Sequence, residues 1–142
     1  MRLVKHLLEL KGNAIHAIAP DKPVLDAIRM MADKYIGALL VMDGQRLVGI
    51  ISERDYARKV ILNGRSSAET LVSEIMSSPV LSVAPGESVN QCMKVMTEKH
   101  VRHLPVVEGE NVVGVLSIGD LVKAVIDDQA EQLEQLQRYI AS

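Results

Sequence analysis

Two eight-residue stretches, Val48-Gly49-Ile50-Ile51-Ser52-Glu53-Arg54-Asp55 and Val113-Gly114-Val115-Leu116-Ser117-Ile118-Gly119-Asp120, are copies of one another. The same offset places Ala19-Pro20 on Ala84-Pro85 and Leu39 on Leu104 without a gap. Two unrelated aliphatic segments would not keep Gly, Ser and Asp in register over this length. The chain therefore contains an internal duplication.

Each copy predicts the same order of elements. An extended segment ends at Pro20 or Pro85, and apolar residues then recur at i, i+3, i+4 and i+7, the spacing of one helical face. Two strands follow, over residues 38–42 and 46–51 and over 104–107 and 111–116, and a second helix starts at Ser52 or Ser117. One such unit alone buries too little apolar surface. The predicted fold class is α+β, with tandem β-α-β-β-α repeats packed about an approximate twofold axis.

The segments around the repeats complete a five-part organisation. We predict an N-terminal helix over residues 1–12, repeat 1 over 13–62, a polar linker over 63–76, repeat 2 over 77–128, and a C-terminal helix over 129–142. Along the last helix, Leu133, Leu136 and Ile140 form an apolar stripe, and this stripe predicts a homodimer.

Composition removes several classes of partner. The net charge is −2 and the chain has no Trp and no Phe, so neither nucleic acid nor an acidic membrane surface is an expected partner. Cys92 is the only cysteine, which rules out an intrachain disulfide and a multi-cysteine zinc site. No apolar run approaches the ~18 residues needed to span a bilayer. A cytoplasmic protein is the expectation.

The repeated Ser-x-x-Asp allows two interpretations. It is close to a capping box, which would stabilise the helix and do nothing more, although Asp reaches the N-cap amide less well than Glu because it is shorter. Alternatively, Ser and Asp face a cleft where unpaired helix amides suit ligand oxygens. The carboxylate would then accept from both hydroxyls of a ribose. The duplication and the preceding Gly49 and Gly114 favour the second interpretation.

Over about residues 12–128 the sequence resembles the CBS-domain family, in particular small bacterial stand-alone proteins made of one CBS pair. The resemblance rests on residues 36–41, 47–59, 74–76 and 101–107 together with the duplication. It implies a non-catalytic regulatory or sensor module that needs no cofactor. It also implies that AMP, ATP, NAD or a related adenosyl compound binds in clefts between the repeats, and that an effector protein of unknown identity reads the bound state.

The resemblance also implies two sets of nucleotide-binding residues. One set is Ser52, Arg54, Asp55, Ser77, Val80, Arg102 and His103; the other is Ser117, Asp120, Asn13, Ile15, His16, Gly37 and Ala38. The sets differ in charge, because Gly119 stands where the first copy has Arg54, and Gly37-Ala38 where the second has Arg102-His103. The Asp55 set is therefore expected to hold phosphate more tightly, and His16 and Lys11 are the cations expected near Asp120. Lys59 is left open between a ligand-facing and a solvent-facing position.

Other functions have less support in the sequence. It contains no nucleophile elbow, no phosphate-binding loop and no complete metal-ligand set, so we expect no catalytic residue and no metal site. His100-x-x-His103 is expected to be a surface or phosphate-facing pair, and Cys92 a buried inert thiol. One alternative stays open: a ligand-free scaffold for dimerisation or protein interaction.

Overall fold

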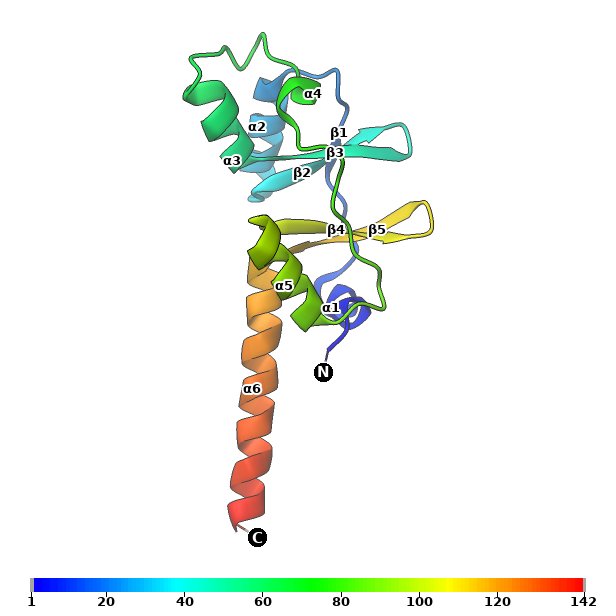
Figure 1. Cartoon of the computed structure of the whole chain (residues 1–142), viewed down its shortest axis with the longest axis vertical. Helices are drawn as coiled ribbons and strands as arrows, with labels where there is room; N and C mark the ends of the chain where they lie inside the picture. Colours follow the sequence, from blue (N-terminus) through cyan, green and yellow to red (C-terminus); the bar gives the residue numbers. More distant parts are fainter. Residues whose placement is uncertain (1, 142) are drawn as a thin grey trace. The chain divides into compact units, whose positions relative to one another are not determined.

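The computed structural model describes residues 2–141; Met1 and Ser142, the outer ends of the predicted terminal helices, lie outside the described residues. The chain divides into two compact units. Unit 2 is continuous in sequence, from Ile15 to Leu81, whereas unit 1 combines the residues up to Ala14 with those from Ser82 onward. The predicted α+β class and the two β-α-β-β-α repeats are confirmed, one in each unit (Figure 1).

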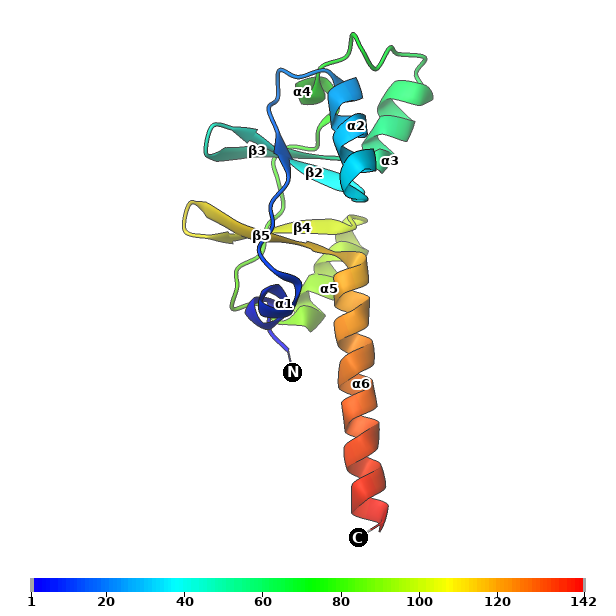
Figure 2. The same ribbon diagram turned by 180° about the vertical axis from the view of Figure 1, so that it is seen from behind.

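Unit 2 is built on a three-stranded sheet of order β1-β2-β3. β1 (Ala17–Ile18) runs parallel to β2 (Ala38–Asp43), and β2 is antiparallel to β3 (Arg46–Ser52). Gly44 turns the hairpin with a φ of 63°, a conformation that favours glycine. The helical elements are α2 (Val24–Lys34), α3 (Glu53–Tyr56) with its π-helical continuation η1 (Ala57–Ile61), and α4 (Val72–Ile75). In Figures 1 and 2 they lie on one side of the β2–β3 hairpin.

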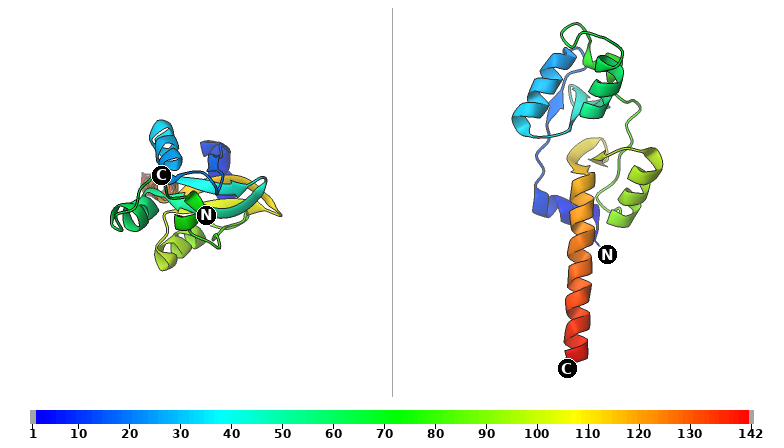
Figure 3. Two further views of the ribbon diagram at one scale, coloured as in Figure 1. Left: turned by 90° about the horizontal axis from the view of Figure 1, so that it is seen from above. Right: turned by 90° about the vertical axis from the view of Figure 1, so that its left-hand side faces the viewer.

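Unit 1 repeats this plan with one difference at each end. Its hairpin is β4 (His103–Glu108) and β5 (Asn111–Ser117), and its helices are α1 (Val4–Lys11), α5 (Val89–Lys99) and α6 (Ile118–Ala141). The counterpart of β1 is only a single parallel bridge from Val83 to Val106. The boundary expected at residue 129 falls inside α6, which continues unbroken because the segment is rich in Ala, Gln, Glu and Leu. Its C-terminal half extends beyond the other elements of unit 1 (Figure 3).

Each repeat is completed by a short helix that lies outside it in the sequence. Val4 of α1 is buried in the core of unit 1 with Leu104 and Leu121, and Val72 of α4 is buried in the core of unit 2. The two helices are joined to their repeats in the same way. Val89 N donates to Arg2 O at 3.0 Å, and Val24 N donates to Thr70 O at 2.8 Å. The N-terminal helix is therefore part of a repeat core rather than an appendage.

Two glycines allow these short helices to approach the sheet. A Cβ on Gly49 of β3 would lie 2.5 Å from Met76 Sδ, just after α4. A Cβ on Gly114 of β5 would lie 2.6 Å from Leu8 Cδ2 on α1. Both distances are far below van der Waals contact. The two glycines of the repeated stretch thus serve packing within each unit.

We expect Gly114→Ala to lower the free energy of unfolding by about 1–3 kcal/mol, because the added methyl overpacks the contact with the buried Leu8. Gly49→Ala should lower it less, because its nearest atoms belong to the flexible, half-buried side chain of Met76. Urea unfolding measures the effect. Gly86→Ala is the matched control, because a Cβ there meets nothing within 4 Å, and it should change stability by no more than about 0.5 kcal/mol. Losses no larger than that of the control would contradict the close approach.

Candidate functional site

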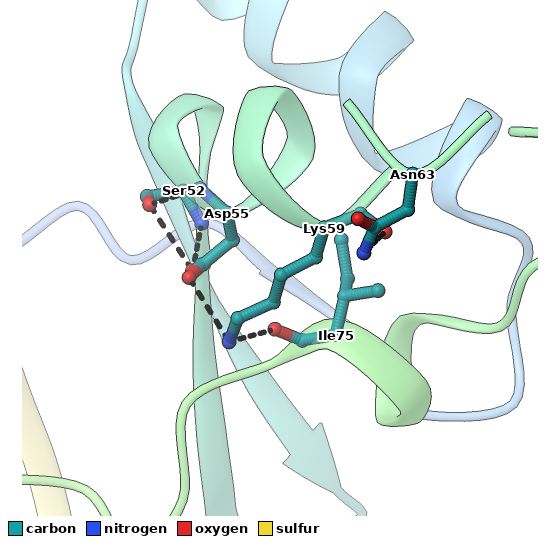
Figure 4. Close-up of polar contacts among 5 residues, drawn as sticks. All are labelled: Ser52, Asp55, Lys59, Asn63 and Ile75. Carbon is teal, nitrogen blue, oxygen red and sulfur yellow. Dashed lines mark hydrogen bonds and ion pairs between the residues drawn. The ribbon is translucent and has the colours of Figure 1, made fainter. Parts of the chain in front are cut away.

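The Ser-x-x-Asp of unit 2 closes on itself at the end of β3 (Figure 4). Asp55 Oδ2 accepts from Ser52 N at 3.0 Å and from Ser52 Oγ at 3.1 Å, and Asp55 N donates back to Ser52 Oγ at 3.2 Å. Lys59 lies one turn further on the same helical segment. Its Nζ is 3.4 Å from Asp55 Oδ1 and donates to Ile75 O at 2.9 Å. Ser52, Asp55 and Lys59 thus form one connected polar group tied to the end of α4.

The Ser-x-x-Asp of unit 1 has the same internal geometry. Asp120 Oδ2 accepts from Ser117 N at 2.8 Å, and Asp120 N donates to Ser117 Oγ at 3.2 Å. A lysine again holds the carboxylate, but it comes from another element. Lys11, the last residue of α1, places Nζ 2.6 Å from Asp120 Oδ2 and donates to Val115 O at 2.6 Å. The two sites are similar in chemistry and differ in the origin of their cation.

Both copies of the motif form the bonds of a capping box, and two sequence expectations are corrected. Both aspartates do reach the N-cap amide, since a three-residue spacing at an extended Ser compensates for the shorter side chain. The first helix amides are not bare either. Glu53 N donates to Gly37 O at 3.0 Å, and Ile118 N donates to Arg102 O at 2.8 Å. The strand entry of each hairpin therefore occupies an amide that the sequence assigned to ligand.

The predicted site residues are distributed over the two units. Unit 2 holds Ile15, His16, Gly37, Ala38, Ser52, Arg54, Asp55, Ser77 and Val80; unit 1 holds Asn13, Arg102, His103, Ser117 and Asp120. Within unit 2, Ala38 is the strand partner of Ser52, and Ser77 exchanges backbone hydrogen bonds with Ile50. Within unit 1, His103 is the strand partner of Ser117. Each predicted set draws on both units, and that combination stays a prediction.

The pKa values of Asp120 and His103 in unit 1 are shifted by burial and by the charged groups near them. Burial raises the pKa of Asp120, but the hydrogen bond from Lys11 and those from Ser117 outweigh it, so the pKa lies below its ordinary value. Burial, Lys11 and Arg102 together lower the pKa of His103, against the opposing effect of Asp120. His103 and Lys11 are thus part of the charge environment of Asp120. From the sequence, Lys11 was expected near Asp120, whereas His103 was placed in the set of residues around Asp55.

Lys59 was the residue that the sequence left undecided. Its spacing of four from Asp55 on one helical segment was the available signal, because side chains at i and i+4 are neighbours. The contact from Lys11 to Asp120 spans most of the chain, and no local pattern predicts it.

The remaining candidates do not form sites. Cys92 is fully buried, and burial together with Glu87 raises its pKa to about 11, as expected for an inert thiol. Among residues 2–141, no group of three or more His, Cys, Asp or Glu side chains is placed to hold a metal ion. Over the same residues, no helix is long and apolar enough to cross a membrane.

The duplicated hairpin-and-helix unit, with a Ser-x-x-Asp closing each copy, is the plan of a CBS domain. The CBS-domain family model matches residues 12–62 and 72–127, and the chain belongs to this family. The two matched segments correspond to the two repeats. The segment from 63 to 71 that separates them lies within the predicted linker, residues 63–76.

Known proteins share both the sequence and the fold. The Arabidopsis thaliana CBS domain-containing protein CBSX3, mitochondrial, is 42% identical over 125 residues, which cover 84% of this chain and 61% of that protein. The chain thus spans less than two thirds of the length of this relative. A solved structure of a CBS-domain protein from Burkholderia ambifaria is 50% identical, with a TM-score of 0.87, and covers 90% of this chain and 96% of its own.

A more distant neighbour shares the fold alone. It is a CBS domain pair solved in complex with methylthioadenosine and S-adenosyl-L-methionine. It is 23% identical, with a TM-score of 0.79, and covers 90% of this chain and 98% of its own.

We expect Lys11→Met to raise the pKa of Asp120, because the main partner of the charged carboxylate is removed. A lowered folded-state pKa contributes stability above the ordinary Asp pKa, and this contribution is lost as the pH falls through the lowered value. Below about pH 5 the wild type should therefore lose stability more steeply than Lys11→Met. Carboxyl NMR titration and unfolding at several pH values measure both effects. Lys5→Met on the same helix is the control, and equal slopes for all three proteins would contradict the assignment.

Proposed function

We propose that the protein is a non-catalytic regulatory module that binds adenosyl ligands at its two Ser-x-x-Asp sites. One observation carries the proposal: the same Ser–Asp arrangement stands at the same point of both repeats, each time with a lysine on the carboxylate. Capping alone explains the Ser and the Asp. It does not explain a cation on each carboxylate, supplied by Lys59 of η1 in one copy and by Lys11 of α1 in the other.

Ribose and phosphate fit these groups together. An ionised carboxylate accepts from both ribose hydroxyls, and the ammonium that it releases can then pair with a phosphate on the same ligand. The fold neighbour that holds methylthioadenosine and S-adenosyl-L-methionine supports an adenosyl ligand in general. The lysines favour AMP, ATP or NAD over methylthioadenosine, because that compound has no phosphate to take up the displaced charge.

The two sites should differ in occupancy. Lys11 holds Asp120 at 2.6 Å, whereas Lys59 lies 3.4 Å from Asp55. A ligand at Asp120 must therefore displace the closer ion pair. Both lysines also donate to a backbone carbonyl, Lys11 to Val115 O at 2.6 Å and Lys59 to Ile75 O at 2.9 Å. We propose Asp55 as the anchor of the tighter site.

Asp55→Asn should weaken AMP binding at the tight site at least tenfold, because a charge-assisted hydrogen bond is lost while an oxygen remains for the N-cap amide. Asp120→Asn should leave that site within about threefold of the wild type. Isothermal titration calorimetry measures both, after a thermal-shift panel of AMP, ADP, ATP, NAD, NADH and S-adenosylmethionine has selected the ligand. Glu53→Gln is the matched control, since it removes a charge from the same turn and leaves Ser52 and Asp55 in place.

Three results would contradict the proposal. Equal losses for both Asp variants would remove the asymmetry. No binding across the whole panel would leave the protein as a ligand-free scaffold. Conversion of ATP or NAD above a no-protein control, abolished by Asp55→Asn, would mean that the protein is an enzyme.

Regulation requires that the bound state reach another chain. A ligand that binds one state of the protein better than another shifts the population toward that state, and this shift needs no turnover. We propose that an effector protein reads the shift and that the module acts as a homodimer in the cytoplasm. Support for the homodimer comes from the exposed apolar residues of α6, among them Leu133, Leu136 and Ile140.

Light scattering at micromolar concentration should give the mass of two chains, with and without AMP. The physical reason is that α6 exposes Leu133, Leu136 and Ile140 along one face, and contiguous exposed apolar side chains mark interaction surfaces. Leu133→Glu should shift the mass toward one chain, whereas Glu131→Gln on the same helix should not. A single-chain mass for the wild type under both conditions would contradict the homodimer.

A further inference from the structure

Six residues of α6 form a continuous line along the helix, which we call the α6 stripe: Val122, Ile126, Gln129, Leu133, Leu136 and Ile140. The intervals alternate between four and three residues, which is the a/d repeat of a coiled coil. The apolar members are exposed by 41% to 72%. Such exposure of five large apolar side chains in one line is unusual for a helix that only packs within its own unit.

The α6 stripe points away from the core of its own unit. α6 packs Ile118 and Val125 partly against that core, but only Leu121 and Ala124, both in its first two turns, are buried there. At 3.6 residues a turn, the midline of the stripe lies roughly 130° around the helix from these two residues. From Gln129 to Ala141 every residue is exposed. A helical segment of this length is marginal without tertiary packing, so this half of α6 needs a partner.

Charge along α6 leaves the stripe open to a second copy. The positions that flank it in a coiled coil carry no carboxylate: they are Lys123, Ala130 and Gln137 on one side and Val125, Gln132 and Tyr139 on the other. The acids Asp127, Asp128, Glu131 and Glu134 lie further round the helix. Two copies therefore meet without burying or opposing like charges. The same acids would repel an anionic lipid surface.

Gln129 decides how the two copies must be aligned. In a parallel, in-register pair each stripe residue meets itself, so Gln129 meets Gln129 of the second copy and the two carboxamides hydrogen-bond to each other. In an antiparallel pair Gln129 would face Leu133, Ile126 would face Leu136, and a buried carboxamide would lack a partner. A single polar residue in an apolar seam sets register and orientation in this way.

We propose that two copies of the protein associate through the α6 stripe as a parallel, in-register coiled coil aligned by Gln129. The proposal rests on the self-association proposed above and is independent of nucleotide binding. It goes further in naming the surface, the direction of pairing and the residue that selects it.

Disulfide trapping tests the arrangement. In Leu136→Cys the new thiol meets its own copy, so mild oxidation should give a covalent dimer in high yield on a non-reducing gel. Gln135→Cys, one position off the stripe, is the matched control and should not cross-link. The wild type should not either, because Cys92 is buried. Both substitutions fall on exposed residues and leave the core unchanged, and circular dichroism checks that the two variants fold.

Mixing experiments separate the two directions. Ile126→Cys and Leu136→Cys chains, mixed before oxidation, should give only the two self-linked dimers. Gln129→Leu removes the polar layer, so in that background a mixed disulfide between positions 126 and 136 should appear. Gln129→Leu should also lower the dissociation constant of the dimer at least tenfold, because the variant buries no carboxamide.

Each contrary result is distinct. A light-scattering dimer that Leu136→Cys does not trap keeps the homodimer and overturns pairing through the α6 stripe. A mixed 126–136 disulfide in the presence of Gln129 overturns the parallel direction. A monomer throughout overturns both the homodimer and the coiled coil, and it points to a different protein or a lipid surface as the occupant of the stripe.

Discussion

The contact between a short helix and a strand glycine governs the architecture of both units. In unit 1 it joins Leu8 of α1 to Gly114, and in unit 2 it joins Met76 to Gly49. Since the rest of unit 1 begins only after residue 81, this unit can close its core only when α1 packs against residues far along the chain, such as Leu104 and Leu121. Neither repeat is self-sufficient. Each unit therefore consists of a sheet, the helices of its repeat, and one short helix from outside the repeat, α1 in unit 1 and α4 in unit 2.

The short helix also connects the core of each unit to the aspartate of the Ser-x-x-Asp motif. Lys11 is the last residue of α1 and holds Asp120, so the packing of Leu8 on β5 fixes where the ammonium lies. In unit 2 the connection runs through Lys59, which bonds both to Asp55 and to the carbonyl that ends α4. A ligand that takes over either carboxylate must loosen a bond between a site and a short helix. Binding energy would thereby act on the element that completes each core.

The sequence predicted most of the fold because its signals are local. The period of the apolar residues marked α2 and α5, and the turns at Gly44 and Gly109 marked both hairpins. It did not predict that α1 belongs to the second repeat, because that contact spans the chain. For the site, Ser52 and Asp55 were found through the repeat, whereas the helix amides expected to be bare are occupied by Gly37 and Arg102 carbonyls. A carbonyl arriving from a neighbouring strand leaves no trace in a four-residue motif.

The two copies differ in the origin of the lysine and in the length of the helix after the motif. They are alike at the residues that pack against or cap the helices. Gly, Ser and Asp recur at matching positions, where each Gly leaves room for a short helix and each Ser and Asp cap the helix that follows. The lysines do not recur, since either origin places a cation on the carboxylate. The helix after the motif diverges most: it ends near Leu62 in the first copy and continues to Ala141 in the second. Because only the second copy extends, the duplication yields two related candidate sites, whereas the surface proposed for self-association occurs once.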